Sequence, residues 1–388
     1  MKNSLLLVCA ALLLCACQHG YVLTGEAGSL NGTAKLSYQL PDGNDFAQEA
    51  PLRNGKFTFK GETPDVLLAS VVLTPEGEDP IRTSTYIENC RIKMQIDPEK
   101  VKDHGRYGGK MFYDVQTTGG RSNALLKAME EARNSVGQLP EFQELAAAMK
   151  ELSNMDQSDR KAYEEKNREV MKKYADILPA YREKGQKAIY DCIFQYPDAE
   201  VGAFMFNLYA RDLSTEEYEA EFGKFTEKVR NSHLAKKTRE ELASRKATQP
   251  GAVAPDFTLK DLEGNPVTLS SLRGRYLILD FWASWCKPCR ASMPAMKELY
   301  AKYHDKGLEI LGISDDNKAE SWKKAVEEDE TPWIHVIDEF PEKNQPSRVG
   351  SLYGVHYIPT YFLLDKNGVI IGKMEHEELQ AKLAELLD

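Results

Sequence analysis

The chain has 388 residues, which is long enough for two or three domains rather than one. Its 42% hydrophobic and 28% charged residues are ordinary for a soluble globular protein. The formal net charge of −10 disfavours nucleic acid as a partner, because an acidic chain is poorly suited to neutralise a row of phosphates.

Residues 1–16 have the pattern of a signal peptide. Lys2 precedes an apolar block, Leu5 to Ala16, which is shorter than the roughly 20 residues of a membrane span. The block closes on Leu14-Cys15-Ala16-Cys17, which resembles the bacterial lipobox. This resemblance implies cleavage before Cys17 and a lipid on its sulfur, and Gln18 favours the outer membrane over the inner one. Ordinary secretion with cleavage nearby is the alternative.

Residues 17–120 predict a small antiparallel β sandwich or barrel. Short runs of alternating or β-branched residues are separated by turn sequences such as Asn54-Gly55 and Pro41-Asp42-Gly43. The strands expected from this pattern include Ala34–Tyr38, Lys56–Lys60, Val66–Leu73, Arg82–Ile87 and Arg91–Ile96.

Residues 121–246 predict a helical region with few glycines and no catalytic pattern. One apolar stripe at helical spacing indicates a buried core: Tyr163, Val170, Tyr174, Ile177 and Tyr181. A further helix after Pro197 is expected to bury Val201, Phe204, Met205, Leu208 and Tyr209. The region is interpreted as a spacer, or as a docking or dimerising surface.

Residues 247–388 begin with a helix-breaking linker and then alternate strands with helices. This order predicts an α/β domain with a mixed sheet covered on both faces. The expected strands are Phe257–Leu259, Val267–Leu269, one from Leu277, Leu308–Ile313, Ile334–Ile337, Tyr361–Leu364 and Val369–Lys373. The expected helices follow Cys286 and cover Lys318–Glu327 and Glu377–Leu387.

The stretch 277–290 joins an apolar strand to a helix and carries two cysteines. This arrangement places Cys286 at the helix start, where unpaired N–H groups and the helix dipole favour a thiolate. Pro288 fits the first turn, where a missing N–H leaves no hydrogen bond unmade. Cys289 follows on the same face, near enough to close a disulfide. The spacing predicts that Cys286 attacks and Cys289 resolves.

Asp280 stands inside the apolar strand between aliphatic and aromatic neighbours. Burying a carboxylate is costly, so the pKa of Asp280 is expected to rise towards the range useful for proton transfer. The alternative is a strand-end aspartate that reaches solvent.

Asp280-Phe281-Trp282-Ala283 and Trp285-Cys286-Lys287-Pro288-Cys289 together resemble thioredoxin. From about Ala252 onward the chain resembles thioredoxin-like oxidoreductases of the TlpA and ResA type, which are related to the AhpC/TSA family. Residues 17–120 are similar, more weakly, to the N-terminal β-domain of such lipoproteins in the Bacteroidetes. That β-domain has no assigned function.

The resemblance also implies roles for individual residues. Asp280 would accept the proton of Cys289, through water, while the mixed disulfide resolves. The bond before Pro359 would be cis and face the disulfide, and Pro294 would kink the active-site helix. The residues expected to contact a client protein are Trp285, Lys287, Pro288, Ile358 and Pro359.

Two other classes of site fit this sequence less well. Zinc needs two more ligands at suitable spacing, and the chain has no second Cys-x-x-Cys or Cys/His pair. A peroxidase of the peroxiredoxin type needs Pro and Thr or Ser at the positions that hold Leu279 and Ala283. No metal and no cofactor beyond the Cys286–Cys289 disulfide are therefore expected.

The implied function is that of a membrane-anchored thiol–disulfide oxidoreductase of the cell envelope, facing the periplasm. It would reduce client disulfides and depend on an upstream electron donor. The motif does not fix the direction of electron flow, so a disulfide oxidase or isomerase stays open. A binding or assembly module on a thioredoxin scaffold is the non-enzymatic alternative, although a scaffold needs neither Asp280 nor Pro359. Cys90 and Cys192 are expected to be two buried thiols, and a disulfide between them is the alternative.

Overall fold

The computed structural model describes residues 20–103, 109–155, 160–341 and 346–388. The chain divides into two compact units. The first runs up to Leu213 and includes Ala220–Thr238, and the second comprises Ser214–Glu219 and Arg239–Asp388. The domain boundaries after residues 16, 120 and 246 stay predictions, and Cys17 lies outside the described residues.

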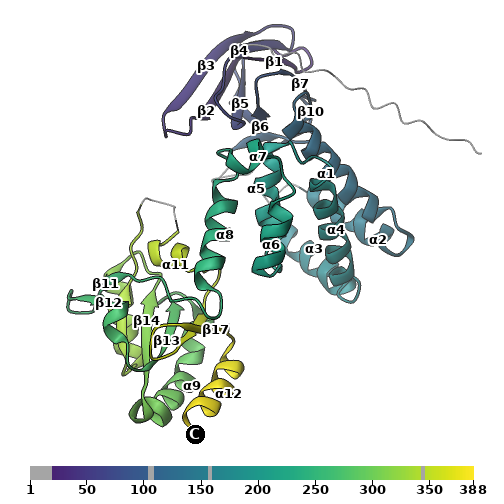
Figure 1. The fold of residues 1–388 in the computed structure, drawn as a ribbon. Coiled ribbons are helices and arrows are strands. Elements are labelled where there is room, and N and C mark those ends of the chain that lie inside the picture. The colour runs from purple at the N-terminus through teal and green to yellow at the C-terminus, as the bar shows by residue number, and fades with distance from the viewer. Residues whose placement is uncertain (1–19, 104–108, 156–159, 342–345) are drawn as a thin grey trace, which may run out of the picture. The chain divides into compact units, whose positions relative to one another are not determined.

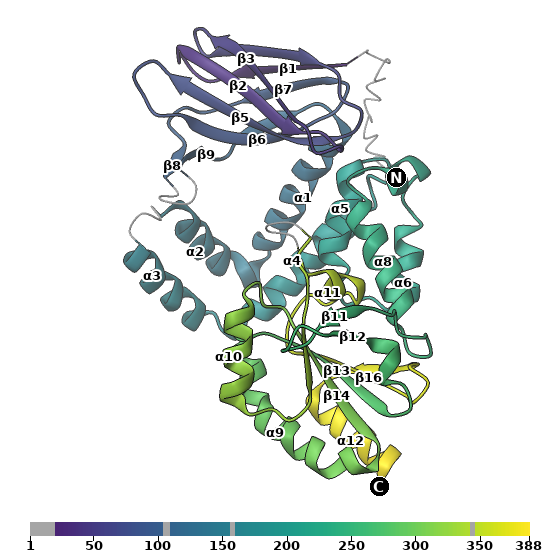
Figure 2. The same ribbon diagram turned by 90° about the vertical axis from the view of Figure 1, so that its left-hand side faces the viewer.

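Two β-sheets make up the N-terminal part of the first unit (Figures 1 and 2). In the described residues, one sheet has the strand order β10-β7-β1-β4 and the other β3-β2-β5-β6-β9-β8. The first contains β1 (Tyr21–Glu26), β4 (Lys56–Gly61), β7 (Arg91–Gln95) and β10 (Gln116–Thr118). The second contains β2 (Gly32–Gln39), β3 (Asp45–Leu52), β5 (Leu67–Pro75), β6 (Ile81–Ile87), β8 (Val101–Asp103) and β9 (Lys110–Phe112).

The sheets are mixed, which differs from the antiparallel pairing expected from the sequence. β1 runs parallel to β7, with Val22 opposite Arg91, and β6 runs parallel to β9, with Ile81 opposite Lys110. Parallel neighbours need a long connection. Here β2 to β6 separate β1 from β7, a relationship that turn signals between successive strands cannot reveal.

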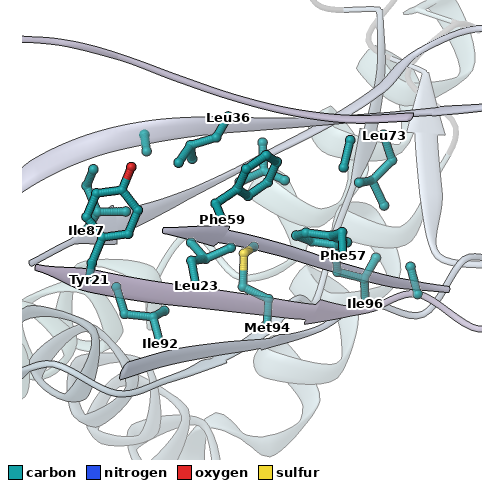
Figure 3. Packing of buried hydrophobic residues seen from close by; sticks show 14 of the residues in the cluster. Tyr21, Leu23, Leu36, Phe57, Phe59, Leu73, Ile87, Ile92, Met94 and Ile96 are labelled. Atoms are coloured by element: carbon teal, nitrogen blue, oxygen red, sulfur yellow. The ribbon is translucent and has the colours of Figure 1, made fainter. Parts of the chain in front are cut away.

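Alternating side chains of the two sheets meet in one hydrophobic core. Leu23 and Met94 point from the first sheet towards Leu36 and Leu73 of the second (Figure 3). Each of these side chains is fully buried, and burial of one such side chain contributes about 1.5–3 kcal/mol. The alternation of buried and exposed residues expected of half-buried strands is therefore present.

Helices complete the first unit. Asn123, on the first of them, accepts a hydrogen bond from Tyr86 N at 3.3 Å and donates to Tyr86 O at 2.9 Å, which fixes this helix against β6. The helices are α1 (Arg121–Gly137), η2 (Pro140–Phe142), α2 (Gln143–Asn154), α3 (Arg160–Lys173), α4 (Leu178–Ile193), α5 (Glu200–Tyr209) and α7 (Glu227–Asn231). Two more, α6 (Thr215–Phe222) and α8 (Lys236–Thr248), have residues in both units.

The predicted apolar stripe forms a core, although it does not follow a single helix. Val170 on α3 and Tyr174 after it are buried, and Tyr163, Ile177 and Tyr181 pack against them. The chain leaves the helix between α3 and α4, so the stripe passes through a turn.

The predicted buried face of α5 is partly wrong. Val201 is buried as expected, but Leu208 is 41% exposed and Phe206 is fully buried. Phe206 packs against Phe222 and Phe225, with ring centroids 6.3 and 5.9 Å away. These rings come from later parts of the chain, so the periodicity of α5 alone does not show which face they cover.

The second unit is built on a seven-stranded sheet, as counted in the described residues, with the order β12-β11-β15-β14-β13-β16-β17. β13, β14 and β15 run parallel, and the outer strands pair antiparallel. The strands are β11 (Thr258–Lys260), β12 (Pro266–Thr268), β13 (Tyr276–Trp282), β14 (Leu308–Ser314), β15 (Ile334–Ile337), β16 (Thr360–Leu364) and β17 (Ile370–Met374). The helices are η3 (Leu269–Leu272), α9 (Lys287–Tyr303), η4 (His304–Lys306), α10 (Ala319–Asp329), α11 (Arg348–Leu352) and α12 (His376–Leu387).

Both faces of this sheet are covered, as the sequence predicts. Ile278 and Trp282 of β13 belong to one core, with buried residues of α9, α10 and α12. Leu279 and Phe281, which point the other way, belong to a second core with Val349 and Tyr353. The central strand is therefore buried on both sides, which explains its continuous apolar sequence.

Candidate active site

Cys286 lies where the central strand meets the following helix. β13 ends at Trp282, and Cys286 is the N-cap of α9, with Lys287 and Pro288 in the first helical turn. The backbone N–H of Cys289 donates to Cys286 Sγ at 3.2 Å. The predicted strand-to-helix placement is confirmed, and a helix N-terminus stabilises negative charge on a cysteine sulfur.

The two cysteines of the motif are joined in a disulfide. The S–S distance is 1.99 Å and the two Cα atoms are 5.3 Å apart. Both residues are buried, and Cys286, the residue predicted to attack, is slightly more exposed, at 4% against 1% for Cys289. Pro294 lies within α9, one turn and a half beyond this pair.

Asp316 holds the turn that leads into Cys286. Its carboxylate accepts hydrogen bonds from Ser284 N at 2.8 Å and from Ser284 Oγ at 2.6 Å. Ser314 Oγ donates to the same carboxylate at 2.7 Å. Because Asp316 follows β14 and Ser284 follows β13, this contact fixes the carboxyl ends of two neighbouring strands.

The loop before β16 lies against the disulfide. The Ile358–Pro359 bond is cis, as the resemblance implied. The carbonyl oxygen of Ile358 is 3.7 Å from Cys286 Sγ, and Thr360 Oγ1 donates to the carbonyl of Tyr357 at 2.7 Å. Ile358 is 72 positions after Cys286 in the sequence, and the fold brings the two residues together.

Asp280 is buried at the centre of the sheet with 1% exposure, so the solvent-reaching alternative is wrong. Asp280 is two residues from Ile278 and from Trp282 on β13, so its side chain lies on the same face as theirs, the face whose core contains Cys289. Burial raises the pKa of Asp280 to about 7. Among the described residues, no group forms a hydrogen bond with Asp280 Oδ1.

Two further residues, in register with Asp280 on β14 and β15, were not singled out from the sequence. Gly312 pairs with Asp280 across the β13–β14 ladder, and His335 pairs with Gly312 on the next strand. Burial lowers the pKa of His335 to about 4, and its Nε2 lies 2.7 Å from Thr331 Oγ1. A lone histidine in the apolar run Ile334–Ile337 was the only sequence signal for this group.

A groove of about 230 Å³ opens beside the disulfide. Trp285 and Tyr357 line it and are 63% and 57% exposed, which is unusual for large aromatic side chains. Ile358 and Asp315 also line it, and burial raises the pKa of Asp315. Lys287 and Pro288 are exposed on the first turn of α9. The predicted client-contacting residues thus gather around Cys286.

The remaining predictions concern the other cysteines, metal binding and membrane spans. Cys90 and Cys192 are both buried thiols, in agreement with the commoner of the two predicted outcomes. The described residues contain no group of three or more His, Cys, Asp or Glu side chains able to hold a metal. Of the helices in the described ranges, none is long and apolar enough to cross a membrane.

The fold and the site together define a class of protein. A Cys-x-x-Cys disulfide lies at the start of the helix that follows the central strand of a mixed sheet, and a loop with a cis proline lies against it. This arrangement is a thioredoxin-like redox centre.

Comparison with known proteins identifies the families and relatives that the chain resembles. The AhpC/TSA family model matches residues 250–373, and the model of a domain of unknown function, DUF4369, matches residues 21–126. The thiol-disulfide oxidoreductase ResA of Bacillus cereus is 36% identical over 141 residues, covering 36% of this chain and 78% of ResA. The thioredoxin-like protein YneN of Bacillus subtilis is 37% identical over 140 residues, covering 35% of this chain and 79% of YneN.

Among solved structures, the thioredoxin domain of a thiol-disulfide oxidoreductase from Bacteroides vulgatus is 34% identical, with a TM-score of 0.33. The match covers 36% of this chain and 98% of the chain in that structure. Through its C-terminal domain the chain belongs to the AhpC/TSA family, and it is a thiol–disulfide oxidoreductase.

Proposed function

We propose that the reduced enzyme transfers two electrons to disulfides in client proteins of the cell envelope. One observation carries the proposal: Cys286 Sγ accepts the N–H of Cys289 at a helix start and lies 3.7 Å from the Ile358 carbonyl. A thiolate at this position is stabilised, and the adjacent backbone is available to a client strand.

The first step forms a mixed disulfide. The Cys286 thiolate attacks one sulfur of the client disulfide, a bond forms between these two sulfurs, and the client S–S bond breaks. The second client sulfur leaves as a thiolate and takes a proton. Trp285, Lys287 and Pro288, exposed around Cys286, contact the client in this step.

The second step releases the reduced client. Cys289 gives up its proton, its sulfur attacks Cys286 Sγ, and the bond between Cys286 and the client breaks. The client has then gained two electrons and two protons, and the Cys286–Cys289 disulfide has formed. Asp280 accepts the Cys289 proton, through water, because burial holds its pKa at about 7, where a carboxylate is an effective base near neutral pH.

The cycle requires a second partner. An external dithiol must return two electrons to the Cys286–Cys289 disulfide before another client is reduced. The enzyme needs no further cofactor for this exchange, because the disulfide itself carries the electrons.

The place of action follows from the N-terminal sequence. Cleavage before Cys17 and acylation of its sulfur anchor the enzyme to a membrane, on the periplasmic side. Gln18 favours the outer membrane. A cell-envelope location also supplies proteins with disulfides, which are rare in the cytosol.

Trapping of clients tests the assignment of the two cysteines. Cys289→Ser stops the cycle after the first step, so it should accumulate clients as mixed disulfides that reductant releases. Cys286→Ser lacks the attacking sulfur and should accumulate few or none. Equal trapping by the two variants, or none by either, contradicts the proposal.

The direction of electron flow is tested by the reduction potential of the Cys286–Cys289 pair, measured in dithiothreitol or glutathione buffers. A value nearer to roughly −270 mV, that of thioredoxin, supports the reductase. A value nearer to roughly −120 mV, that of the oxidant DsbA, shows an oxidase.

A further inference from the structure

A buried carboxylate on α8 is bound to the loop that lies against the disulfide. Glu241 is 9% exposed, and its Oε2 lies 2.8 Å from His356 Nε2. Arg245 Nε donates to the other oxygen of Glu241 at 2.6 Å. Burial raises the pKa of Glu241, but the hydrogen bonds from His356 and Arg245 outweigh it and hold this pKa below its usual range.

The same stretch of α8 packs closely on the chain just before His356. A Cβ atom added to Gly354, which has φ +60°, would lie 2.7 Å from Ser244 Oγ. Gly354 therefore allows both the left-handed backbone and the close approach of Ser244. Two independent contacts, one through Glu241 and one through Ser244, thus fix residues 354–356 on α8.

This fixed segment leads directly to the atoms beside the disulfide. His356 is two residues before Ile358, whose carbonyl oxygen is 3.7 Å from Cys286 Sγ. His356, Tyr357 and Ile358 all line the groove next to Trp285. Lys373 Nζ lies 4.9 Å from the centre of the Tyr357 ring. A shift of His356 would therefore alter both the groove and the backbone that is presented to a client.

We infer that Glu241 is a positioning residue: through His356 it holds residues 354–358, the docking loop, in the shape that binds client proteins. This inference rests on the proposed reduction of clients. It also assigns part of the client site to a helix that precedes the region 250–373 matched by the AhpC/TSA family.

The charges around Glu241 explain why its loss should move the loop. His356, Arg245 and Lys373 surround this carboxylate on three elements, and burial lowers the pKa of Lys373. Without the negative charge, these groups lose the carboxylate that they share, and an amide in its place accepts only a weaker, uncharged hydrogen bond from His356. The docking loop is then held less firmly on α8 at His356.

The test compares two substrates with the full mature chain. Glu241→Gln should lower kcat/KM for reduction of insulin about 10-fold, mainly through KM, because a displaced loop no longer aligns the client strand. Reduction of hydroxyethyl disulfide, which is too small to need the loop, should be unchanged. Glu219→Gln is the matched control, because Glu219 forms an exposed ion pair with Lys246 of the same helix.

Substitutions of His356 test the same contact from the other side and cover the case in which Glu241→Gln fails to fold. His356→Ala should reproduce the selective loss of insulin reduction. His356→Gln, whose amide can still donate to Glu241, should retain insulin reduction. Unchanged insulin reduction in both Glu241→Gln and His356→Ala overturns the inference, as does an equal loss with both substrates. Failure of the wild type to reduce insulin refutes the proposed function instead.

Discussion

Asp280 and Gly312 face each other across the β13–β14 ladder at the centre of the second unit. Gly312 has no side chain, and the space that a Cβ would take is approached by His335 Nδ1 at 2.6 Å and Trp282 Nε1 at 3.2 Å. Neither nitrogen has a hydrogen-bond partner among the described residues. The glycine thus lets two ring nitrogens approach the backbone of β14 at the position opposite the buried carboxylate.

Gly312→Ala should destabilise the second unit. The added methyl group would overlap the His335 ring, and overpacking of this kind costs about 1–3 kcal/mol. Thermal denaturation followed by near-UV circular dichroism should show a lower Tm. Gly185→Ala is the control: nothing lies within 4 Å of its Cβ position inside α4, so this change should slightly raise stability. An unchanged Tm for Gly312→Ala would show that His335 moves aside freely.

Asp280→Asn should remove a pH dependence of folding stability. The wild type keeps a proton on Asp280 up to pH 7 when folded but loses it near pH 4 when unfolded, so its stability falls between these values. A rise from 3.8 to about 7 corresponds to about 4 kcal/mol, because one pKa unit is about 1.4 kcal/mol.

Urea denaturation at pH 4 and pH 8 measures this effect as a difference between proteins. The free energy of unfolding of Asp280→Asn, relative to the wild type, should increase by a few kcal/mol from pH 4 to pH 8. Asp305→Asn, on an exposed position of η4, should show no such increase. A constant difference between Asp280→Asn and the wild type would mean that Asp280 ionises as easily as in the unfolded chain.

The same substitution should slow release of the client. Asp280→Asn retains the shape of the side chain but cannot take the Cys289 proton, so resolution of a mixed disulfide should be slow near neutral pH. The defect should shrink as the pH approaches about 8.5, where a thiol ionises unaided. The mixed disulfide between Cys286 and a peptide is formed first and then mixed rapidly into buffers between pH 6 and pH 9, and the rate of peptide release is measured at each pH. Equal rates for both proteins at pH 7 would show that the proton leaves by another route.

The parts of the site that could be predicted from sequence are those encoded by local order. The strand-to-helix junction positions Cys286 and Cys289, and apolar neighbours on both sides bury Asp280. The cis bond at Pro359 was predicted from the thioredoxin resemblance, since an Ile-Pro sequence alone rarely adopts it. These features need no knowledge of which distant strands pair.

The features that were missed depend on packing between distant segments. The register of three strands brings His335 next to Gly312, the strand partner of Asp280, and Glu241 meets His356 across 115 residues. The parallel pairing of β1 with β7 is a relationship of the same kind. Helical or strand periodicity shows which face of an element is buried, but not which other segment covers it.

Cys17→Ala should abolish membrane attachment. Without the cysteine there is no sulfur to acylate, and the mutant should remain unprocessed or be released in soluble form. Mass spectrometry of the mature wild-type N-terminus should show diacyl- or triacylglycerylcysteine. Cys15→Ala serves as the control and should leave the modification in place. A soluble wild-type protein that starts at another residue contradicts the anchor.

Asp316→Ala should impair the enzyme towards every substrate, unlike Glu241→Gln. The change leaves Ser284 N–H and two serine hydroxyls without their acceptor, and one unsatisfied buried group costs about 1–3 kcal/mol. Because Ser284 is two residues before Cys286, the turn should loosen and the sulfur should lose its position at the start of α9. We expect lower stability in urea, and kcat/KM reduced alike for insulin and hydroxyethyl disulfide. Asp305→Ala, on the exposed η4, should change neither quantity. A loss confined to insulin would mean that Asp316 acts on client docking rather than on the position of Cys286.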